Sequence, residues 1–251
     1  MSDILGIDIG GSGIKAAPVS TITGELLAKK SRVPTPQPAT PDAVLDVIEQ
    51  LAEHFTWDGP VGAGFPGVVK AGIVKTAVNL DKGWVDLDAD ALITERLGAD
   101  AHVINDADAA GLAEVRFGAG RDVEGVVMMV TLGTGIGTAL FSGGVLLPNT
   151  ELGHLVMDGE EAEQRAAARI REEHDLSWMT WGHRVQAYLA EVERLLWPDL
   201  IVIGGGVSDD FDQFEPYLAD VKARIVPATM ENRAGIVGAA LASYEATRLA
   251  G

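Results

Sequence analysis

Residues 6–15 read GIDIGGSGIK, and a related stretch, TLGTGIG, returns at residues 131–137. In each, an apolar, β-branched segment leads into a glycine-rich turn and then into a second apolar segment. Glycine has no Cβ and reaches positive φ, so such a turn lets backbone N–H groups converge on an anion. Each turn leads into a strand and not a helix, which separates it from P-loop and Rossmann patterns. One such turn alone is explained by a tight β-hairpin, but two favour a pair of sites that hold one phosphate-bearing ligand.

Hydroxyl and basic side chains accompany these turns. Ser12 lies in the first turn and Lys15 follows it, while Thr131 and Thr134 lie in the second. A third glycine run, in IVIGGGVS at residues 201–208, lies where a strand meets a loop or helix, and we expect it near the far end of the ligand. The predicted phosphate-donor residues are Asp8, Gly10, Gly11, Ser12, Gly13, Lys15, Thr131, Gly133, Thr134, Gly135, Gly204, Gly205 and Gly206.

Asp8 lies inside the first apolar strand, where a carboxylate is costly unless it is paired, hydrogen-bonded or metal-bound. Beside a phosphate site, Mg²⁺ held directly or through water is the simplest explanation. We therefore predict that Asp8 is a Mg²⁺ ligand. A carboxylate that stabilises the fold through hydrogen bonds is the alternative.

Composition limits the class of protein. The chain has 251 residues, of which 47% are apolar and 22% are charged, as in ordinary folded proteins. It has no cysteine, which excludes disulfides, thiolate zinc sites and a cysteine nucleophile. The net charge of −18 argues against binding to nucleic acid or to an anionic membrane. With neither a secretory signal nor a membrane-spanning run recognised, we expect a cytoplasmic enzyme.

The expected elements follow the same order twice. Each half begins with a strand, a glycine turn and a second strand, and TGELL at residues 23–27 is expected to form a third strand. A helix is predicted to follow Thr40 as N-cap and Pro41 at its first position. A further helix is predicted at residues 162–174, AEQRAAARIREEH. This repetition predicts an α/β fold with two similar halves.

The division between the halves is expected near residues 106–120. We predict a smaller N-terminal lobe of residues 1–106 and a larger C-terminal lobe of residues 107–251. For the terminal helix, residues 234–250, packing against the N-terminal lobe is an alternative to packing within the C-terminal lobe.

Glycine turns that recur in both halves resemble those of the actin-like ATPase superfamily. Within it, three more segments resemble the sugar-binding segments of the repressor–ORF–kinase (ROK) family: GFPGVV at 64–69, INDADAAGLAE at 104–114 and NTELGHL at 149–155; the glycine turns and NRAGIVGAAL at 232–241 complete the match. The resemblance covers the chain in the family's order. It implies a two-lobed actin-like (ribonuclease H-like) fold, in which each half is a mixed sheet with flanking helices.

The resemblance also implies a sugar kinase and its site. Asp106 matches the family's catalytic base, which accepts the proton of the sugar's 6-hydroxyl; its position between a strand and a helix suits a carboxylate that faces a cleft. A helix N-cap is the alternative role for Asp106. Without the zinc motif the alignment of this segment to the family is open, so Glu160 or Glu161 can take the sugar-binding role in place of Glu163. The sugar-binding positions implied are Gly64, Pro66, Gly67, Asn79, Asn105, Asp106, Glu151, His154 and Glu163.

One departure from the family narrows the resemblance. Most ROK proteins carry a cysteine-rich zinc motif after the Glu-x-Gly-His segment, and this chain has no cysteine. The segment SWMTWGHRVQAYLAEVERLLWPDLIVIGGGVS, residues 177–208, is similar to the branch without that motif, which phosphorylates glucose from polyphosphate or ATP. The implied partners are glucose, polyphosphate or ATP, Mg²⁺ and a second copy in a homodimer. An ATP-dependent hexokinase acting on glucose or mannose is the alternative, and a sugar-sensing regulator a more distant one.

Overall fold

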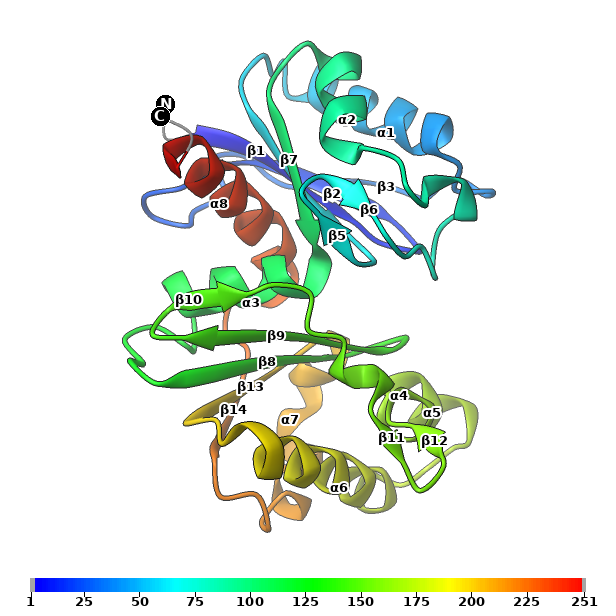
Figure 1. Cartoon of the computed structure of the whole chain (residues 1–251), viewed down its shortest axis with the longest axis vertical. Coiled ribbons are helices and arrows are strands. Elements are labelled where there is room, and N and C mark those ends of the chain that lie inside the picture. The colour runs from blue at the N-terminus through cyan, green and yellow to red at the C-terminus, as the bar shows by residue number, and fades with distance from the viewer. Residues whose placement is uncertain (1–2, 250–251) are drawn as a thin grey trace. The chain divides into compact units, whose positions relative to one another are not determined.

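The computed structural model describes residues 3–249, and the contacts divide the chain into two units (Figure 1). Unit 1 comprises the chain up to Ala113 and from Arg233 onward, and unit 2 comprises Glu114–Asn232. The division falls within helix α3, Asp106–Phe117, a little beyond the predicted boundary. Helix α8, Ala234–Leu249, belongs to unit 1. Position 250 of the expected terminal helix, and positions 1, 2 and 251 of the expected lobes, lie outside the described residues.

Unit 1 is built on a five-stranded sheet of order β3-β2-β1-β4-β7. The strands β1, β2 and β3 form an antiparallel meander, and β4 and β7 run parallel to β1. The elements are β1 (Asp3–Ile9), β2 (Ile14–Ser20), β3 (Ser31–Val33), α1 (Pro41–His54), β4 (Val61–Phe65), β5 (Val69–Lys70), β6 (Ile73–Val74), α2 (Ala89–Leu97), β7 (Ala101–Asn105), the start of α3, and α8.

Unit 2 repeats this topology with a sheet of order β10-β9-β8-β13-β14. Again the first three strands form an antiparallel meander, and the last two run parallel to the first. The predicted mixed sheet in each half is confirmed. The elements are β8 (Val126–Leu132), β9 (Ile136–Ser142), β10 (Val145–Leu147), β11 (Val156–Met157), β12 (Glu160–Glu161), α4 (Glu163–Ala166), α5 (Ala168–Glu173), α6 (Trp178–Leu196), β13 (Leu200–Gly204), α7 (Phe211–Phe214) and β14 (Arg224–Pro227).

One face of the unit 1 sheet is covered by α8, which lies unusually close to the strands. A Cβ at Gly6 of β1 would overlap the carbonyl of Ile236, and one at Gly62 of β4 would overlap the carbonyl of Ala239. Glycine within a strand marks such close approach of another backbone. The opposite face carries the apolar core, in which the alternating side chain of Ile7 packs with helix α1.

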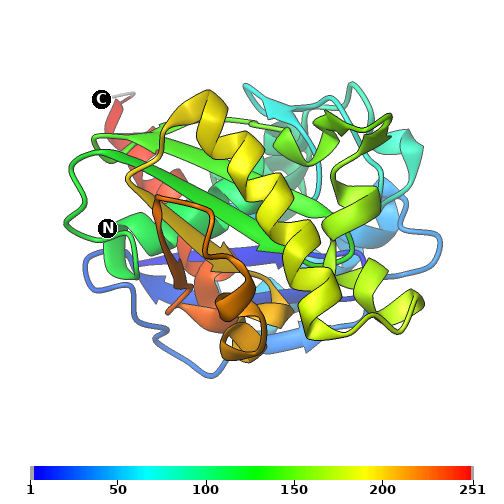
Figure 2. The same ribbon diagram turned by 90° about the horizontal axis from the view of Figure 1, so that it is seen from below.

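Unit 2 buries its sheet under α6, an amphipathic helix of 19 residues that crosses the strands (Figure 2). Trp181, Val185 and Leu189 of α6 are fully buried in the same cluster as Val130 of β8 and Ile203 of β13. Across residues 3–249, the helices include none whose length and apolar character would let it cross a membrane.

The predicted third strand at residues 23–27 was wrong. Within that stretch, Leu26 forms only an isolated bridge with Val19, and the strand that extends the sheet is β3. The N–H of Leu27 donates to the carbonyl of Pro18 at 2.8 Å, but Pro18 has no N–H for the reciprocal bond. The ladder therefore stops there, and the chain rejoins β2 nearer its beginning.

The helix predicted at residues 162–174 is broken into α4 and α5. Ala167 lies between them with φ −58° and ψ 150°, which is extended backbone. Its two neighbours are also alanine, a good helix former, so the sequence carries no local sign of the break. The break starts a new helix, α5, whose first turn contacts the second glycine turn.

Candidate active site

Three predicted parts of the site in unit 1 lie at one edge of the sheet. Strands β1, β4 and β7 are parallel neighbours, with Asp8 opposite Gly64. Asp8 is near the carboxyl end of β1, the Gly64–Gly67 turn leaves β4, and Asp106 directly follows β7. Open α/β sheets bind ligands at the carboxyl ends of their parallel strands. The topology therefore brings these three parts to the edge where a ligand is expected.

Asn105 uses its side chain to organise this edge. It is buried, with 6% of its surface exposed. Its Oδ1 accepts the N–H groups of Ala107 at 2.9 Å and Asp108 at 3.0 Å, and its Nδ2 donates to the carbonyl of Gly67 at 3.1 Å. Asn105 therefore caps α3 and fixes the turn after β4. The half-buried Asp106 also accepts the N–H of Ala107, through Oδ1 at 2.8 Å, which anchors its carboxylate at the helix start.

The turn after β4 is shaped by a close backbone approach. A Cβ at Gly67 would overlap the carbonyl of Thr76, and Thr76 Oγ1 accepts the N–H of Val68 at 2.8 Å. Pro66 is buried in the same turn. The exposed Asn79 lies at the first glycine turn, since a Cβ built on Gly11 would be 3.4 Å from the Cβ of Asn79.

The first glycine turn is closed by a hydrogen bond from the N–H of Gly10 to the carbonyl of Gly13, 3.1 Å long. Beside it, Lys15 Nζ and Asp8 Oδ2 form an ion pair at 3.1 Å, and their side chains are 28% and 20% exposed. Gly235 at the start of α8 lies over Asp8, because a Cβ there would be 3.0 Å from the Asp8 Cγ. Gly11 and Ser12 are exposed at the tip of the turn.

Unit 2 brings the second and third glycine runs together. The N–H of Gly133 donates to the carbonyl of Gly135 at 3.0 Å, which closes the turn around Thr134. Gly205 has φ +85°, and a Cβ there would overlap the carbonyl of Leu132, the residue before the turn. The register also places Thr131 of β8 opposite Gly204, so the run that continues to Gly206 lies against the base of the second turn.

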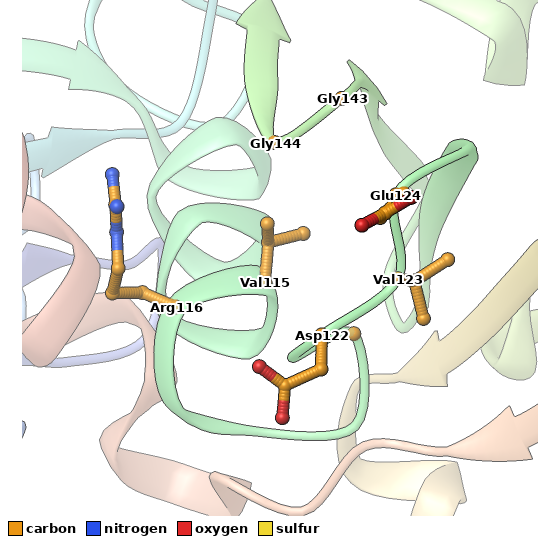
Figure 3. Close-up of a pocket in the computed structure, with 8 residues that line it drawn as sticks. Val115, Arg116, Asp122, Val123, Glu124, Gly143 and Gly144 are labelled. Atoms are coloured by element: carbon orange, nitrogen blue, oxygen red, sulfur yellow. The ribbon is translucent and has the colours of Figure 1, made fainter.

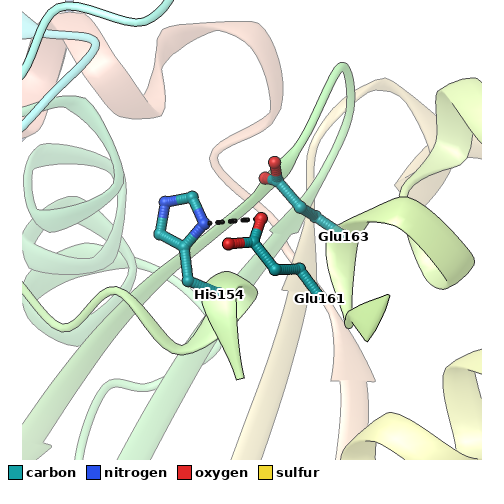
Figure 4. A group of neighbouring side chains, drawn as sticks. All are labelled: His154, Glu161 and Glu163. Atoms are coloured by element: carbon teal, nitrogen blue, oxygen red, sulfur yellow. Dashed lines mark hydrogen bonds and ion pairs between the residues drawn. The ribbon is translucent and has the colours of Figure 1, made fainter. Parts of the chain in front are cut away.

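The predicted sugar residues of unit 2 form one cluster around His154, and Figure 4 shows His154 with Glu161 and Glu163. Its Nδ1 lies 3.2 Å from Glu161 Oε2, and its Nε2 lies 3.6 Å from Glu151 Oε2. Burial lowers the pKa of His154, but the hydrogen bond to Glu161 and the charges of Glu163, Glu161 and Glu151 outweigh it and raise that pKa above its ordinary value. The imidazole is therefore a cation among three carboxylates over a wider pH range than usual.

Glu163 links this cluster to the second glycine turn. Its Oε2 accepts the N–H of Ile136 at 3.4 Å, and a Cβ at Gly135 would be 2.6 Å from the same oxygen. Ligand atoms of His154, Glu161 and Glu163 also lie within 4.8 Å of one another, near enough to share a metal ion. Of the two alternatives to Glu163, Glu161 contacts His154 directly, whereas Glu160 is exposed on β12.

Two arginines contact the glycine turns without any sequence pattern that singles them out. Arg32 Nη2 donates to the carbonyl of Ser12, and Arg169 Nε donates to the carbonyl of Thr134, each at 2.9 Å. A correctly assigned third strand would have indicated Arg32, because Arg32 is the cross-strand neighbour of Lys15. The contact between Arg169 and the second turn depends on the helix break at Ala167, which the sequence does not indicate.

A pocket of about 350 Å³ in unit 2 contains none of the predicted residues. Arg116, Asp122 and Glu124 line it together with Gly143 and Gly144 (Figure 3). It lies where β8 begins and β9 ends, the opposite end of that hairpin from the second glycine turn. The pocket is therefore separate from the candidate site within this unit.

Comparison with known proteins supports the family resemblance independently of the structure. The sequence pattern of the ROK family matches residues 4–174. The chain is 47% identical to polyphosphate glucokinase of Mycobacterium tuberculosis, over 96% of this chain and 91% of the relative. Inorganic polyphosphate/ATP-glucomannokinase from Arthrobacter sp. strain KM superposes with a TM-score of 0.93 at 47% identity, covering 98% and 100% of the two chains.

A ROK glucokinase from Streptomyces griseus, solved with glucose and AMPPNP, superposes with a TM-score of 0.82 at 26% identity, covering 97% of this chain and 99% of that one. The matches span both units, so the predicted actin-like fold is confirmed together with the family resemblance. The chain belongs to the ROK family.

Proposed function

We propose that this protein is a kinase that transfers a phosphoryl group from inorganic polyphosphate to the 6-hydroxyl of glucose. The observation that carries this conclusion is the 47% identity to a polyphosphate glucokinase over 96% of the chain. The glycine turns, and the carboxylate at the end of β7, provide the groups that such a reaction needs. Phosphoryl transfer requires a positioned nucleophile, a proton acceptor and neutralisation of the donor's charge.

Asp106 is the proposed general base. It directly follows a parallel strand, and the N–H of Ala107 holds its Oδ1 at 2.8 Å, so its carboxylate is oriented before the sugar arrives. The sugar's 6-hydroxyl gives its proton to this carboxylate as the hydroxyl oxygen attacks the terminal phosphorus of the donor. The bond between that phosphorus and the bridging oxygen breaks, and the shortened polyphosphate leaves with the bridging oxygen. Help of this kind contributes about 10²–10⁴-fold to turnover.

The remaining sugar contacts are proposed for each unit separately. In unit 1 we propose Asn79, Asn105 and the turn that contains Gly64, Pro66 and Gly67. In unit 2 we propose Glu151, His154 and Glu163. Hydroxyls buried without partners each cost about 1–3 kcal/mol, so a sugar site needs several fixed polar groups. The cluster around His154 supplies such groups in an arrangement fixed by its own hydrogen bonds and ion pairs.

The donor is proposed to bind at the glycine turns with Mg²⁺. Asp8 suits this ion, because its carboxylate is a hard oxygen ligand, remains partly exposed and lies beside the first turn. Mg²⁺ typically uses only one or two protein carboxylates and completes its shell with water and donor phosphates. When bound, the ion neutralises donor oxygens. The protein's part is to hold the donor through Gly10–Gly13, Gly133–Gly135 and Gly204–Gly206.

ATP and mannose form a second candidate pair of substrates. The observation that favours them is the similarity to a polyphosphate/ATP-glucomannokinase, with 47% identity over nearly the whole chain. Glucose or mannose, each supplied with polyphosphate or ATP, gives four reactions to compare. We also propose that the protein is a cytoplasmic homodimer; sedimentation of the purified protein tests the dimer.

The test measures all four reactions with purified protein and with Asp106→Asn. Asparagine keeps an acceptor for the N–H of Ala107, so the fold and the sugar affinity should remain while kcat falls by at least about 10²-fold. Asp212→Asn, at an exposed position, is the control and should be unaffected. Absence of glucose 6-phosphate with both donors would contradict the function, and unchanged kcat in Asp106→Asn would remove this residue from the mechanism.

A further inference from the structure

The two glycine turns have an equivalent position that carries a hydroxyl. Ser12 precedes Gly13 in the first turn, and Thr134 precedes Gly135 in the second. Each turn follows the central antiparallel strand of its sheet, β1 or β8, and each is closed by one backbone hydrogen bond. Ser12 and Thr134 therefore occupy the same place in the repeated architecture.

At both places an arginine guanidinium donates to the backbone carbonyl. Arg32 reaches Ser12 from strand β3, and Arg169 reaches Thr134 from helix α5, each at 2.9 Å. In unit 2 the strand equivalent to β3 is β10, which carries no arginine. Repetition of the sheet therefore does not explain the shared contact, because unrelated elements supply it.

The contact changes what an anion meets at the turn. A backbone carbonyl carries partial negative charge and repels phosphate, whereas backbone N–H groups attract it. A guanidinium bonded to the carbonyl offsets that charge and adds further N–H donors in a planar fork, which suits phosphate oxygens. Each arginine thus converts a mixed turn into one that favours anions.

Arg32 has the stronger case as a direct ligand. Its side chain is exposed and lies flat over Gly13, where a Cβ would be 2.5 Å from Nε and 2.7 Å from Cζ. Among the residues described, no carboxylate forms an ion pair with Arg32, whereas its neighbour Lys15 is paired with Asp8. In a chain of net charge −18, Arg32 is an uncompensated cation at a glycine turn.

Arg169 holds the second turn more extensively and is less available. Its backbone N–H donates to the carbonyl of Gly133 at 3.1 Å, in addition to the side-chain bond to Thr134. Its guanidinium also pairs with Glu173 at 3.7 Å, which offsets part of its charge. These contacts describe a positioning residue that sets the conformation of the turn.

We propose that Arg32 is a direct ligand of the phosphate donor and that Arg169 positions the second turn for the donor. The ligand is a chain of phosphates, either inorganic polyphosphate or the triphosphate of ATP. This proposal rests on the proposed function, because that function places the donor at the glycine turns.

The first test is direct binding, which needs no turnover. Titration calorimetry of inorganic tripolyphosphate and of ATP, each with Mg²⁺, is compared for the parent, Arg32→Gln and Arg32→Lys. We expect Arg32→Gln to weaken binding about 10- to 100-fold, the range for loss of one charged hydrogen bond, and Arg32→Lys to lie between. Arg194→Gln, an exposed arginine of α6, is the control and should bind like the parent.

The second test separates the two arginines by kinetics. Arg32→Gln should raise the KM for the donor without changing kcat or the KM for glucose. Arg169→Gln should lower kcat as well as raise the donor KM, whereas Glu172→Gln, at an exposed position of the same helix, should change neither. A larger effect on tripolyphosphate than on ATP would identify polyphosphate as the preferred ligand, and the reverse would identify the nucleotide.

Two results would overturn the proposal. Parent-like donor binding by Arg32→Gln, with its circular dichroism intact, would show that Arg32 is not a ligand. Parent-like kinetics for Arg169→Gln would show that it does not position the turn. If the parent binds tripolyphosphate but phosphorylates no sugar, the proposed function fails while the binding comparison still tests Arg32. If Arg32→Gln does not fold, the donor affinity of Arg32→Lys is the deciding measurement. An affinity equal to that of the parent would show that the planar guanidinium of Arg32 is not needed to bind the donor.

Discussion

Glu114 is the charged residue whose replacement should most damage the stability of unit 2. It is fully buried. Its Oε1 accepts the N–H groups of Thr229 at 2.9 Å and Met230 at 2.6 Å, and its Oε2 accepts the N–H of Ala119 at 2.8 Å and the hydroxyl of Thr229 at 3.3 Å. Glu114 follows the first point where the chain passes between the units, and Met230 shortly precedes the second. One carboxylate thus joins the first and last segments of unit 2.

Glu114→Ala leaves three backbone N–H groups without their acceptor. A buried donor without a partner costs about 1–3 kcal/mol, and the one at Met230 is fully buried whereas the other two reach water more easily. We therefore expect a loss of about 3–5 kcal/mol, a large share of the stability of about 5–15 kcal/mol that is typical of a domain. Glu114→Gln keeps one acceptor oxygen and should lose less.

Urea unfolding gives the free energy, and hydrogen exchange locates the effect. The amides of Ala119, Thr229 and Met230 should lose protection in Glu114→Ala before the amides of β8 do. Glu172→Gln, at an exposed position of α5, is the matched control and should stay within about 0.5 kcal/mol of the parent. If Glu114→Ala were as stable as this control, the buried carboxylate would not hold these segments, and the reasoning would be refuted.

Two further predictions concern the histidine cluster and the packing of α8. Glu161→Gln removes the hydrogen bond that helps to raise the pKa of His154, so this pKa should fall toward the ordinary value of about 6.5 in an NMR titration. A raised histidine pKa stabilises the fold at pH values below the ordinary pKa. The parent should therefore be more stable than Glu161→Gln by the full amount at such pH values, and this difference should vanish as the pH rises through the pKa of the folded state. A difference in stability that does not depend on pH would contradict this. Gly62→Ala should cost at least about 2 kcal/mol in urea unfolding because its Cβ meets the backbone of α8. Gly98→Ala, with φ +67° and open space around it, should cost only about 1 kcal/mol, and equal losses would contradict the packing argument.

The features that the sequence predicted well depend only on residues that are neighbours in the chain. An apolar run followed by a glycine turn predicts strand, turn and strand, as found at Gly10–Gly13 and Gly133–Gly135. The N-cap at Thr40 accepts the N–H of Ala43 at 3.4 Å, as its position before Pro41 predicts. Such signals need only neighbouring residues, so the repeated halves and the carboxylate after β7 were visible without coordinates.

The features it missed depend on residues far apart in the chain. Strand β3 is short and pairs with the beginning of β2, so nothing within residues 31–33 indicates its partner. The two leucines of TGELL favour a strand there instead, so the sequence analysis missed Arg32 together with β3. The break at Ala167 lies in a run of alanines that predicts helix, yet it determines where α5, the helix that carries Arg169, begins.

The sequence pattern alone does not decide which of three glutamates takes the predicted sugar-binding role, whereas the structure distinguishes their contacts. Glu160, Glu161 and Glu163 lie so close in sequence that a shift of register exchanges them. In the fold, Glu161 contacts His154 at 3.2 Å, whereas Glu163 reaches the N–H of Ile136 beside the second glycine turn. The two are therefore not interchangeable, because Glu161 fixes the imidazole and its charge while Glu163 joins the cluster around His154 to the proposed donor turn.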